Sequence, residues 1–180
     1  MGNAINYLHF SSEKAAVVIE KAQDKDNSKL LDFSMNTWPS GSHLTEVKGG
    51  GTNLHPHDER TTFNDNLFSM NGPMIYKMAR KTVYDQIQKD LKKHNLTTSD
   101  IDLLIPHQAS GLAVKAYSKF GGFSEKKVMN IIGQYGNCVS ASIPLALSMA
   151  IQNKKIKRGD LVLMIGTGAG LSVASTLFKF

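Results

Sequence analysis

The sequence predicts a layered α/β sheet, because helical and strand-like segments alternate along most of its length. From residue 70 onward the predicted order is helix, strand, helix, strand, helix, strand, strand, which is typical of layered α/β domains. The 180 residues and 41% hydrophobic content are enough for one ordinary core. The longest apolar runs have the length of strands, far short of the roughly 20 residues needed to cross a bilayer.

The first third of the chain is less regular. Two β-rich runs, Ala15 to Glu20 and Leu30 to Asn36, flank the polar segment Gln23 to Ser28, and this pattern predicts a hairpin. Thr37 to Ser69 shows no sustained period and contains Gly49-Gly50-Gly51. We expect a long surface loop or a linker there, either covering a site or connecting two halves of the molecule.

The clearest helix is predicted from Pro73 to His94. Apolar residues recur every four positions between Ile75 and Leu91, which gives the helix one apolar stripe. Pro73 suits the first turn, and Lys92-Lys93 suits the last turn, where the helix dipole is negative. We expect the stripe to pack in the core.

Four short apolar runs have the length of buried strands: Ile101 to Ile105, Val128 to Ile132, Leu161 to Ile165 and Val173 to Phe178. Between them, we predict helices from about Ala109 to Phe120 and, with Pro144 in its early turns, up to about Asn153. The last two runs flank Gly166-Thr167-Gly168-Ala169-Gly170, which predicts two strands joined by a tight turn.

Composition narrows the classes of partner. The formal charge of +6 and the pI of about 9.4 favour phosphates, acidic proteins or nucleic acid. No recognised nucleic-acid-binding module accompanies the charge, and no apolar run could span a bilayer, so neither nucleic acid nor a membrane is expected as a partner. The first ten residues lack the features of a secretory signal, which predicts a cytoplasmic protein.

Two weaker motifs are set aside. His55-Pro56-His57-Asp58, with His43 upstream, has the residue types of a metal site, but Pro56 gives no fixed ligand geometry, so we expect solvated surface and no metal. The glycine-rich segment from Gly166 to Gly170 resembles a dinucleotide loop, which would need a following helix and an acidic residue about 20 positions on. Only strand-like residues follow, and no cofactor is expected.

Three segments place polar atoms or bare backbone where strand-like runs end: Pro106-His107-Gln108-Ala109, Tyr135-Gly136-Asn137 and Gly166-Thr167-Gly168-Ala169-Gly170. Open α/β sheets build their sites at the ends of strands. A histidine and an asparagine can each donate a hydrogen bond to one developing oxyanion, and glycine-rich backbone can bring an amide close to a second. The pattern predicts carbonyl or enolate chemistry.

In their order and separation, these segments resemble the C-terminal half of the 3-oxoacyl-(acyl-carrier-protein) synthase III family, condensing enzymes of the thiolase superfamily. The resemblance runs from about Met70 to Phe180 and implies a thiolase-like layered α/β fold with a complete C-terminal half. Residues 70–180 are interpreted as the condensing-enzyme domain. Residues 1–69, a hairpin plus a long loop, are interpreted as the remnant of an N-terminal half that is mostly absent.

The resemblance implies a decarboxylative Claisen condensation. In this family a cysteine takes the acyl group from an acyl-CoA, and malonyl-acyl carrier protein then loses CO₂ to give the attacking enolate. The resemblance assigns His107, as a neutral donor, and Asn137 to the malonyl thioester oxygen. It assigns the backbone of Gly168 and Ala169 to the acyl thioester oxygen. Acyl carrier protein and acyl-CoA are the implied partners, in fatty acid or related biosynthesis.

The sequence departs from the family pattern at three places. The nucleophilic cysteine of the family lies in the N-terminal half, upstream of the matched residues. The single cysteine, Cys138, stands where members have a small non-nucleophilic residue, and we expect it to be buried packing, because a reactive thiol needs an accessible, electropositive setting. Leu112 replaces an arginine that members often direct at phosphates, so Lys115 or Lys119 would have to serve. Phe10 to Ala15 replaces a Gly-Asp-Gly-Ala type turn.

Three functions remain open at this stage. The chain is part of an acyltransferase that needs a Cys-bearing half and is inactive alone; or it is a catalytically inactive, truncated paralogue acting as a structural partner subunit; or it is a polyanion-binding module. The presence of His107 and Asn137 favours descent from an active enzyme over the third function. Half of a layered fold would leave an apolar face exposed, so we expect a homo- or hetero-oligomer.

Overall fold

The computed structural model describes residues 14–19, 28–50 and 52–180. Its centre is a mixed four-stranded sheet in the order β1-β6-β5-β4. The strands are β1 (Lys29–Thr37), β4 (Leu103–Pro106), β5 (Leu161–Gly168) and β6 (Ser172–Lys179). Within the described residues, no helix is both long enough and apolar enough to cross a bilayer.

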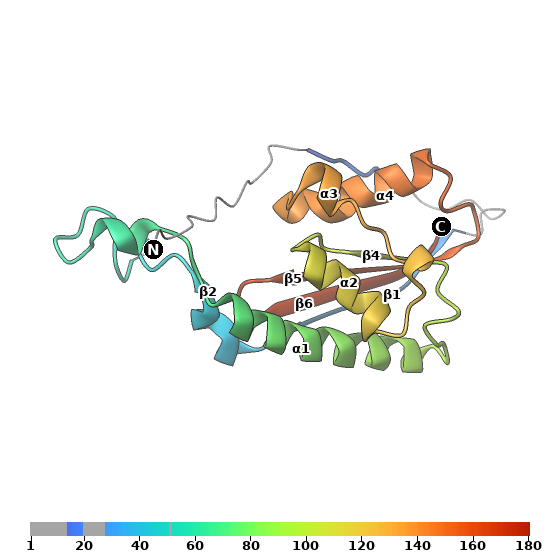
Figure 1. Cartoon of the computed structure of the whole chain (residues 1–180), viewed down its shortest axis with the longest axis horizontal. Coiled ribbons are helices and arrows are strands. Elements are labelled where there is room, and N and C mark those ends of the chain that lie inside the picture. Colours follow the sequence, from blue (N-terminus) through green and yellow to red (C-terminus); the bar gives the residue numbers. More distant parts are fainter. Residues whose placement is uncertain (1–13, 20–27, 51) are drawn as a thin grey trace, which may run out of the picture.

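Helices cover both faces of the sheet (Figure 1). On one face lie α1 (Gly72–Lys93) and α2 (Gly111–Lys119), and on the other lie α3 (Ile132–Tyr135) and α4 (Ser142–Gln152). The short β4 shows why both faces are apolar: Leu104 packs in the cluster with α1 and α2, whereas Leu103 and Ile105 pack in the cluster with α4. A strand buried on both faces reads as a continuous apolar run, as this one does.

The predicted strands at the C-terminus are confirmed. β5 and β6 form an antiparallel hairpin in which Gly168 pairs with Ser172, and β4 runs parallel to β5. Gly170, in the connecting turn, has φ +138°, a conformation that side chains rarely adopt. The parallel pairing continues one residue beyond β4, because the His107 N–H donates to the Ile165 carbonyl at 2.8 Å.

The predicted long helix is confirmed as α1. Its first turn is capped by the Asn71 side chain, which accepts from the Met74 N–H at 3.2 Å, and its last turn holds Lys92 and Lys93. The helices predicted near Ala109 to Phe120 and up to Asn153 are confirmed as α2 and α4.

The predicted N-terminal hairpin is wrong. Residues 15–19 are exposed and carry no strand, while the rest of its first strand and most of its turn, residues 20–27, lie outside the described residues. The second strand is real and forms β1, but it pairs antiparallel with β6. Among the described residues, no strand pairs with the β-rich run at residues 15–19, and β propensity alone does not make a ladder.

The predicted strand from Val128 to Ile132 is also wrong. Only an isolated bridge between Leu104 and Val128 forms, and the chain then turns into α3. The physical reason is the buried side chain of Gln108. Its Nε2 donates to the Met129 carbonyl at 3.1 Å and its Oε1 accepts from the Ile131 N–H at 2.9 Å, so a side-chain amide satisfies backbone groups that a strand would have paired.

The segment predicted to be irregular, Thr37 to Ser69, begins with the last residue of β1 and contains short elements. These are the 3₁₀ helices η1 (Pro39–Leu44) and η2 (Phe63–Asn66), and the two-stranded ladder of β2 (Thr45–Glu46) and β3 (Ser69–Met70). Residues 47–50 and 52–68 extend away from the sheet beyond this ladder (Figure 1). Two more 3₁₀ turns, η3 (Glu125–Lys127) and η4 (Val139–Ala141), lie near the other helices.

A buried polar cluster holds β1 against α1. Asp90 accepts hydrogen bonds from Ser34 on β1, from Ser175 on β6 and from Gln86 one helical turn away. Gln86 also accepts from the amide of Asn36. Because every second side chain of β1 points toward α1, the intervening residues point to the opposite face of the sheet.

A second contact joins β1 to the end of α1. Lys93 Nζ lies 2.7 Å from one Asp32 carboxylate oxygen, and His94 Nε2 lies 2.9 Å from the other. These hydrogen bonds lower the pKa of Asp32 from 3.8 to about 2, and they outweigh the opposing effect of burial.

The lowered pKa predicts an acid-dependent contribution to stability. The interaction stabilises the fold fully above about pH 4 and is lost as the pH falls through about 2, because the unfolded chain then binds a proton that the folded chain resists. Urea denaturation from pH 5 to pH 2 should therefore show Asp32→Asn to be less stable than the wild type by about 1 kcal/mol at the upper end, with the difference vanishing at the lower end. The control is Asp85→Asn, which removes an exposed pair with Lys81. An Asp32→Asn difference that does not change with pH would contradict this assignment.

Candidate active site

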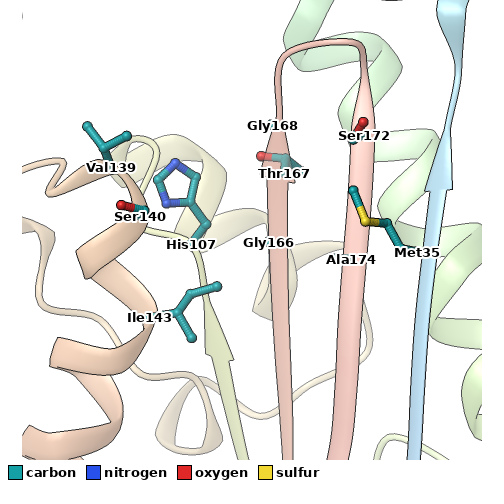
Figure 2. Close-up of a pocket in the computed structure, with 10 residues that line it drawn as sticks. All are labelled: Met35, His107, Val139, Ser140, Ile143, Gly166, Thr167, Gly168, Ser172 and Ala174. Atoms are coloured by element: carbon teal, nitrogen blue, oxygen red, sulfur yellow. The ribbon is translucent and has the colours of Figure 1, made fainter. Parts of the chain in front are cut away.

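A pocket of about 340 Å³ opens where β4, β5 and the start of α4 meet (Figure 2). His107 lines it from β4, Gly166, Thr167 and Gly168 from β5, and Val139, Ser140 and Ile143 from the start of α4 and the turn before it; Met35, Ser172 and Ala174 complete the wall. The two adjacent strand ends predicted to meet, at His107 and at the glycine-rich turn, do line one pocket.

Gln108 fixes the direction in which His107 leaves the strand. Its side chain is fully buried, and besides bonding to the 129–131 segment it donates to the Pro106 carbonyl at 2.8 Å. The peptide group between Pro106 and His107 is thereby held at both ends, because β5 accepts from its N–H and the Gln108 side chain donates to its C=O. A site residue mounted on a strand end held in this way is pre-positioned.

The imidazole of His107 is partly buried between β5 and the start of α4. Burial lowers the pKa of His107 below its usual value near 6.5, because the protonated ring is poorly solvated there. Nδ1 lies 2.6 Å from Ser142 Oγ at the first residue of α4. His107 is therefore a neutral imidazole at pH 7, with one ring nitrogen engaged and the other available to the pocket.

Asn137 lies at the rim of this region and is not part of the pocket wall. Gly136 ends α3 with φ +67°, and the chain then turns so that Asn137 Oδ1 accepts from the Val139 N–H at 2.9 Å. The amide nitrogen of Asn137 donates to the Ala109 carbonyl over a long 3.5 Å, two residues beyond His107. The structure brings Asn137 to the same strand end as His107, with its one described donor contact at the limit of hydrogen bonding.

Asn137 also supports a strained residue. Val139 has φ +48°, in the left-handed region that β-branched residues avoid, and such a residue costs on the order of 1–3 kcal/mol. The hydrogen bond from the Val139 N–H to Asn137 helps to hold this turn against the pocket. Loss of the Asn137 side chain would therefore disturb the pocket wall as well as remove a donor.

Only part of the glycine-rich turn lines the pocket. Gly168 lines the pocket at the end of β5, whereas Ala169 is exposed in the turn and does not belong to the wall. Among the described residues, nothing beyond its chain neighbours lies within 4 Å of the place where a Cβ of Gly168 would stand. A bound group could approach this part of the backbone closely.

Cys138 is buried, as expected, with only 3% of its surface exposed. Its thiol donates to the Tyr135 carbonyl at 3.4 Å. It is not part of the pocket wall. Leu112 is 75% exposed on α2, and Lys115 and Lys119 of the same helix are also exposed.

The predicted histidine cluster lies in the irregular segment between β2 and β3. The rings of His55 and His57 lie 5.4 Å apart, and Asp58 is paired with Arg60, which lowers the pKa of Asp58. Within the residues that the structure describes, no three His, Cys, Asp or Glu side chains converge as metal ligands would.

Sequence reasoning missed Ser142 and Val139. Ser142 lies in a run of small residues where nothing distinguishes it from a packing residue, and its contact with His107 joins positions 35 residues apart. Val139 follows the Gly-Asn pair, but its strained backbone carries no sequence signature. Met35 was also missed, because it lies on β1, a strand that was predicted with the wrong pairing partner.

The chain is similar in sequence to known proteins. Residues 91–180 match the protein family described as 3-oxoacyl-[acyl-carrier-protein (ACP)] synthase III C terminal. The chain is 34% identical to the beta-ketoacyl-[acyl-carrier-protein] synthase III of Aliarcobacter butzleri, over 95% of this chain and 51% of that protein. It is 36% identical to the Synechocystis protein of the same name, over 95% of this chain and 52% of that one.

A solved structure shows the same fold. The 3-oxoacyl-[acyl-carrier-protein] synthase III of Aquifex aeolicus superposes with a TM-score of 0.74 at 29% identity, over 88% of this chain and 46% of that one. This chain thus has the α/β fold of the C-terminal half of these thiolase-like proteins, as predicted, and it spans about half the length of the curated relatives it matches. The family match over residues 91–180, together with the shared fold, shows that the chain belongs to the 3-oxoacyl-(acyl-carrier-protein) synthase III family.

Proposed function

We propose that this chain supplies the decarboxylating half of a condensing site, which catalyses the Claisen condensation of malonyl-acyl carrier protein with an acyl thioester in fatty acid or related biosynthesis. The observation that carries the proposal is the neutral, partly buried His107 facing the bare backbone of Gly168 across one pocket. In this proposal residues 70–180 form the condensing-enzyme domain, and residues 1–69 derive from the N-terminal half of the family fold.

His107 and Asn137 are proposed to act on the malonyl thioester oxygen. As the C–C bond to the carboxylate breaks, CO₂ leaves and the electron pair moves onto the thioester, giving an enolate whose oxygen becomes negative. Two neutral donors stabilise that charge in a partly dehydrated pocket more than they stabilise the uncharged substrate. The backbone of Gly168 and Ala169 is proposed to serve the acyl thioester oxygen in the same manner.

The acyl group itself needs a nucleophile from elsewhere. Cys138 is buried and outside the pocket, so we assign the acyl-accepting cysteine to an N-terminal half, on the same longer polypeptide or on a separate subunit. The enolate then attacks that acyl-cysteine carbonyl, a C–C bond forms, and the thiolate leaves. This chain alone should bind substrate without condensing it.

An uncovered part of the sheet marks where the second half would dock. α4 covers β4 and β5, while Phe33 and Met35 on the same face of β1 are 62% and 60% exposed. Ser34 and Asn36 bond to α1, which confirms that Phe33 and Met35 point the other way. Large apolar side chains exposed together are typical of an interface, and Met35 reaches the pocket wall, so the docked half would close the site.

Carrier protein and acyl-CoA are proposed to approach along α2. Lys115 and Lys119 are exposed there, and the guanidinium of Arg80 on α1 lies 4.9 Å from the ring centre of Phe120, next to Lys119. These cations could attract an acidic protein or a phosphate, although Leu112 removes the arginine that relatives often carry on this helix.

A second function, that of an inactive structural partner subunit, is favoured by one observation. The carboxamide of Asn137 is held by backbone groups at both ends, Val139 and Ala109, and lies outside the pocket wall. In that function Asn137 would support the fold of the turn alone, and the exposed β1 face would serve assembly without catalysis.

An assay of the completed site separates the two functions. The chain, alone and mixed with the N-terminal half of a synthase III relative, is given malonyl-acyl carrier protein and acyl-CoA, and CO₂ and 3-oxoacyl product are measured. We expect no product from the chain alone and turnover from the mixture. His107→Ala or Asn137→Ala should lower that turnover about 10²- to 10³-fold, the typical cost of one oxyanion donor.

Cys138→Ser is the matched control, because it alters the neighbour of Asn137 without touching the pocket wall. It should keep the turnover of the mixture. Turnover that survives His107→Ala would remove His107 from the mechanism, and turnover by the chain alone that disappears in Cys138→Ser would make Cys138 the nucleophile. A mixture that associates but never turns over would favour the structural role.

Association through β1 can be measured separately. Light scattering at micromolar concentration should show a homo-oligomer, or a complex when the N-terminal half is added. Phe33→Ser and Met35→Ser should weaken that association at least tenfold, since each removes an apolar side chain from the interface. Tyr84→Ser, on the outer surface of α1, is the control and should leave it unchanged. A monodisperse monomer that does not bind the N-terminal half would contradict the proposed docking face.

A further inference from the structure

Ser142 is the polar partner of His107 inside the fold. It is the first residue of α4, its side chain is fully buried, and its Oγ lies 2.6 Å from His107 Nδ1. The same hydroxyl is also placed to donate to the Val139 carbonyl oxygen at 2.9 Å, and Oγ accepts from the Gln108 backbone N–H at 3.4 Å. A hydroxyl carries a single proton, so its direction decides which ring nitrogen of His107 carries the imidazole proton.

The surrounding hydrogen bonds favour one direction. The Val139 carbonyl already accepts from the Ser142 backbone N–H, so it does not depend on the hydroxyl. The Gln108 N–H can only donate to Oγ. Hydrogen bonds from O–H donors are on average shorter than those from N–H donors, and the 2.6 Å separation suits donation by the hydroxyl, so we assign its proton to Nδ1.

A neutral imidazole whose Nδ1 accepts must carry its proton on Nε2. Nδ1 is directed toward the start of α4, and Nε2 is the nitrogen left for the pocket (Figure 2). Within residues 14–19, 28–50 and 52–180, no hydrogen bond to Nε2 is present, so its proton is available to a bound group.

We propose that Ser142 is a positioning residue that donates its hydroxyl proton to His107 Nδ1 and thereby keeps the pocket nitrogen, Nε2, protonated as a donor. A ring with the opposite tautomer would present a lone pair to the negative oxygen and oppose its formation. The importance of this contact for condensation rests on the proposed function, whereas the tautomer itself is a property of the folded chain.

Nitrogen-15 NMR tests the tautomer directly in the intact chain. In a long-range proton–nitrogen correlation, a protonated ring nitrogen and an unprotonated one have widely separated shifts, and the pattern of couplings tells Nε2 from Nδ1. His107 is identified among the 6 histidines by the signals lost in His107→Gln. We expect, at pH 7, an unprotonated Nδ1 and a protonated Nε2. A proton on Nδ1 would overturn the proposal without any variant.

The role of Ser142 is tested by a matched pair of variants. Ser142→Ala should shift His107 toward a mixture of tautomers, whereas Ser140→Ala, which changes an exposed serine of the same pocket wall, should leave the wild-type pattern. Ser142→Thr, which keeps the hydroxyl, should restore it. An unchanged tautomer in a folded Ser142→Ala would overturn the positioning role, and if that variant does not fold, the wild-type pattern still decides the proposal.

A kinetic assay distinguishes the role of Ser142 from the proposed condensing function. In the mixture with an N-terminal half, Ser142→Ala should lower kcat roughly tenfold with little change in KM. This is the expected effect of losing one hydrogen bond that stabilises the transition state. If the expected tautomer is found but the mixture never condenses, the proposed function fails and the tautomer assignment stands. If the mixture condenses and the Ser142→Ala variant is fully active, the catalytic importance of Ser142 fails.

Discussion

The parallel pairing of β4 with β5 determines where the candidate site residues lie. It sets the register that ends with His107 beside Ile165, one residue before the glycine-rich segment begins. Because parallel strands end at the same edge of a sheet, the imidazole and the bare backbone of Gly168 reach one pocket from strands far apart in the sequence. The helices on the two faces of the sheet bury the apolar strands that form this edge.

Polar side chains buried near this edge refine the position of the pocket. The Gln108 side chain bonds the end of β4 to the 129–131 segment, and Ser142 of α4 contacts the ring of His107. Each buried polar atom is costly unless it is bonded, so these contacts hold the local geometry more tightly than apolar packing would. On the other face, Asp90 and its partners fix β1 in register and leave Phe33 and Met35 pointing toward the side where a second half would dock.

Much of the fold was predictable because the signals are local. The apolar stripe of α1 and the continuous apolar runs of β4 and β5 are read directly from spacing, and His107 follows a strand that ends at Pro106. The errors arose where the partner of a segment matters. Residues 15–19 have strand-like composition but no pairing strand within the part of the chain that the structure describes, and residues 129–131 are bonded by the Gln108 side chain in place of a strand. Ser142 and the strained Val139 could not be predicted, because their roles depend on contacts that only the folded chain creates.

The proposed site exists only if three elements meet at His107: the start of α4, the end of β4 and the strand β5. Methyl-labelled NOE spectroscopy measures this most directly, because proton pairs give signals only when they are close in space. The structure predicts NOEs from the ring protons of His107 to the methyl groups of Val139 and Ile143. It also predicts an NOE from the δ-methyl group of Ile143 to the α protons of Gly166, because that methyl group packs closely against Gly166. Ring protons of His107 that show contacts only within β4, with none to the α4 side, would contradict the convergence on which the proposed chemistry rests.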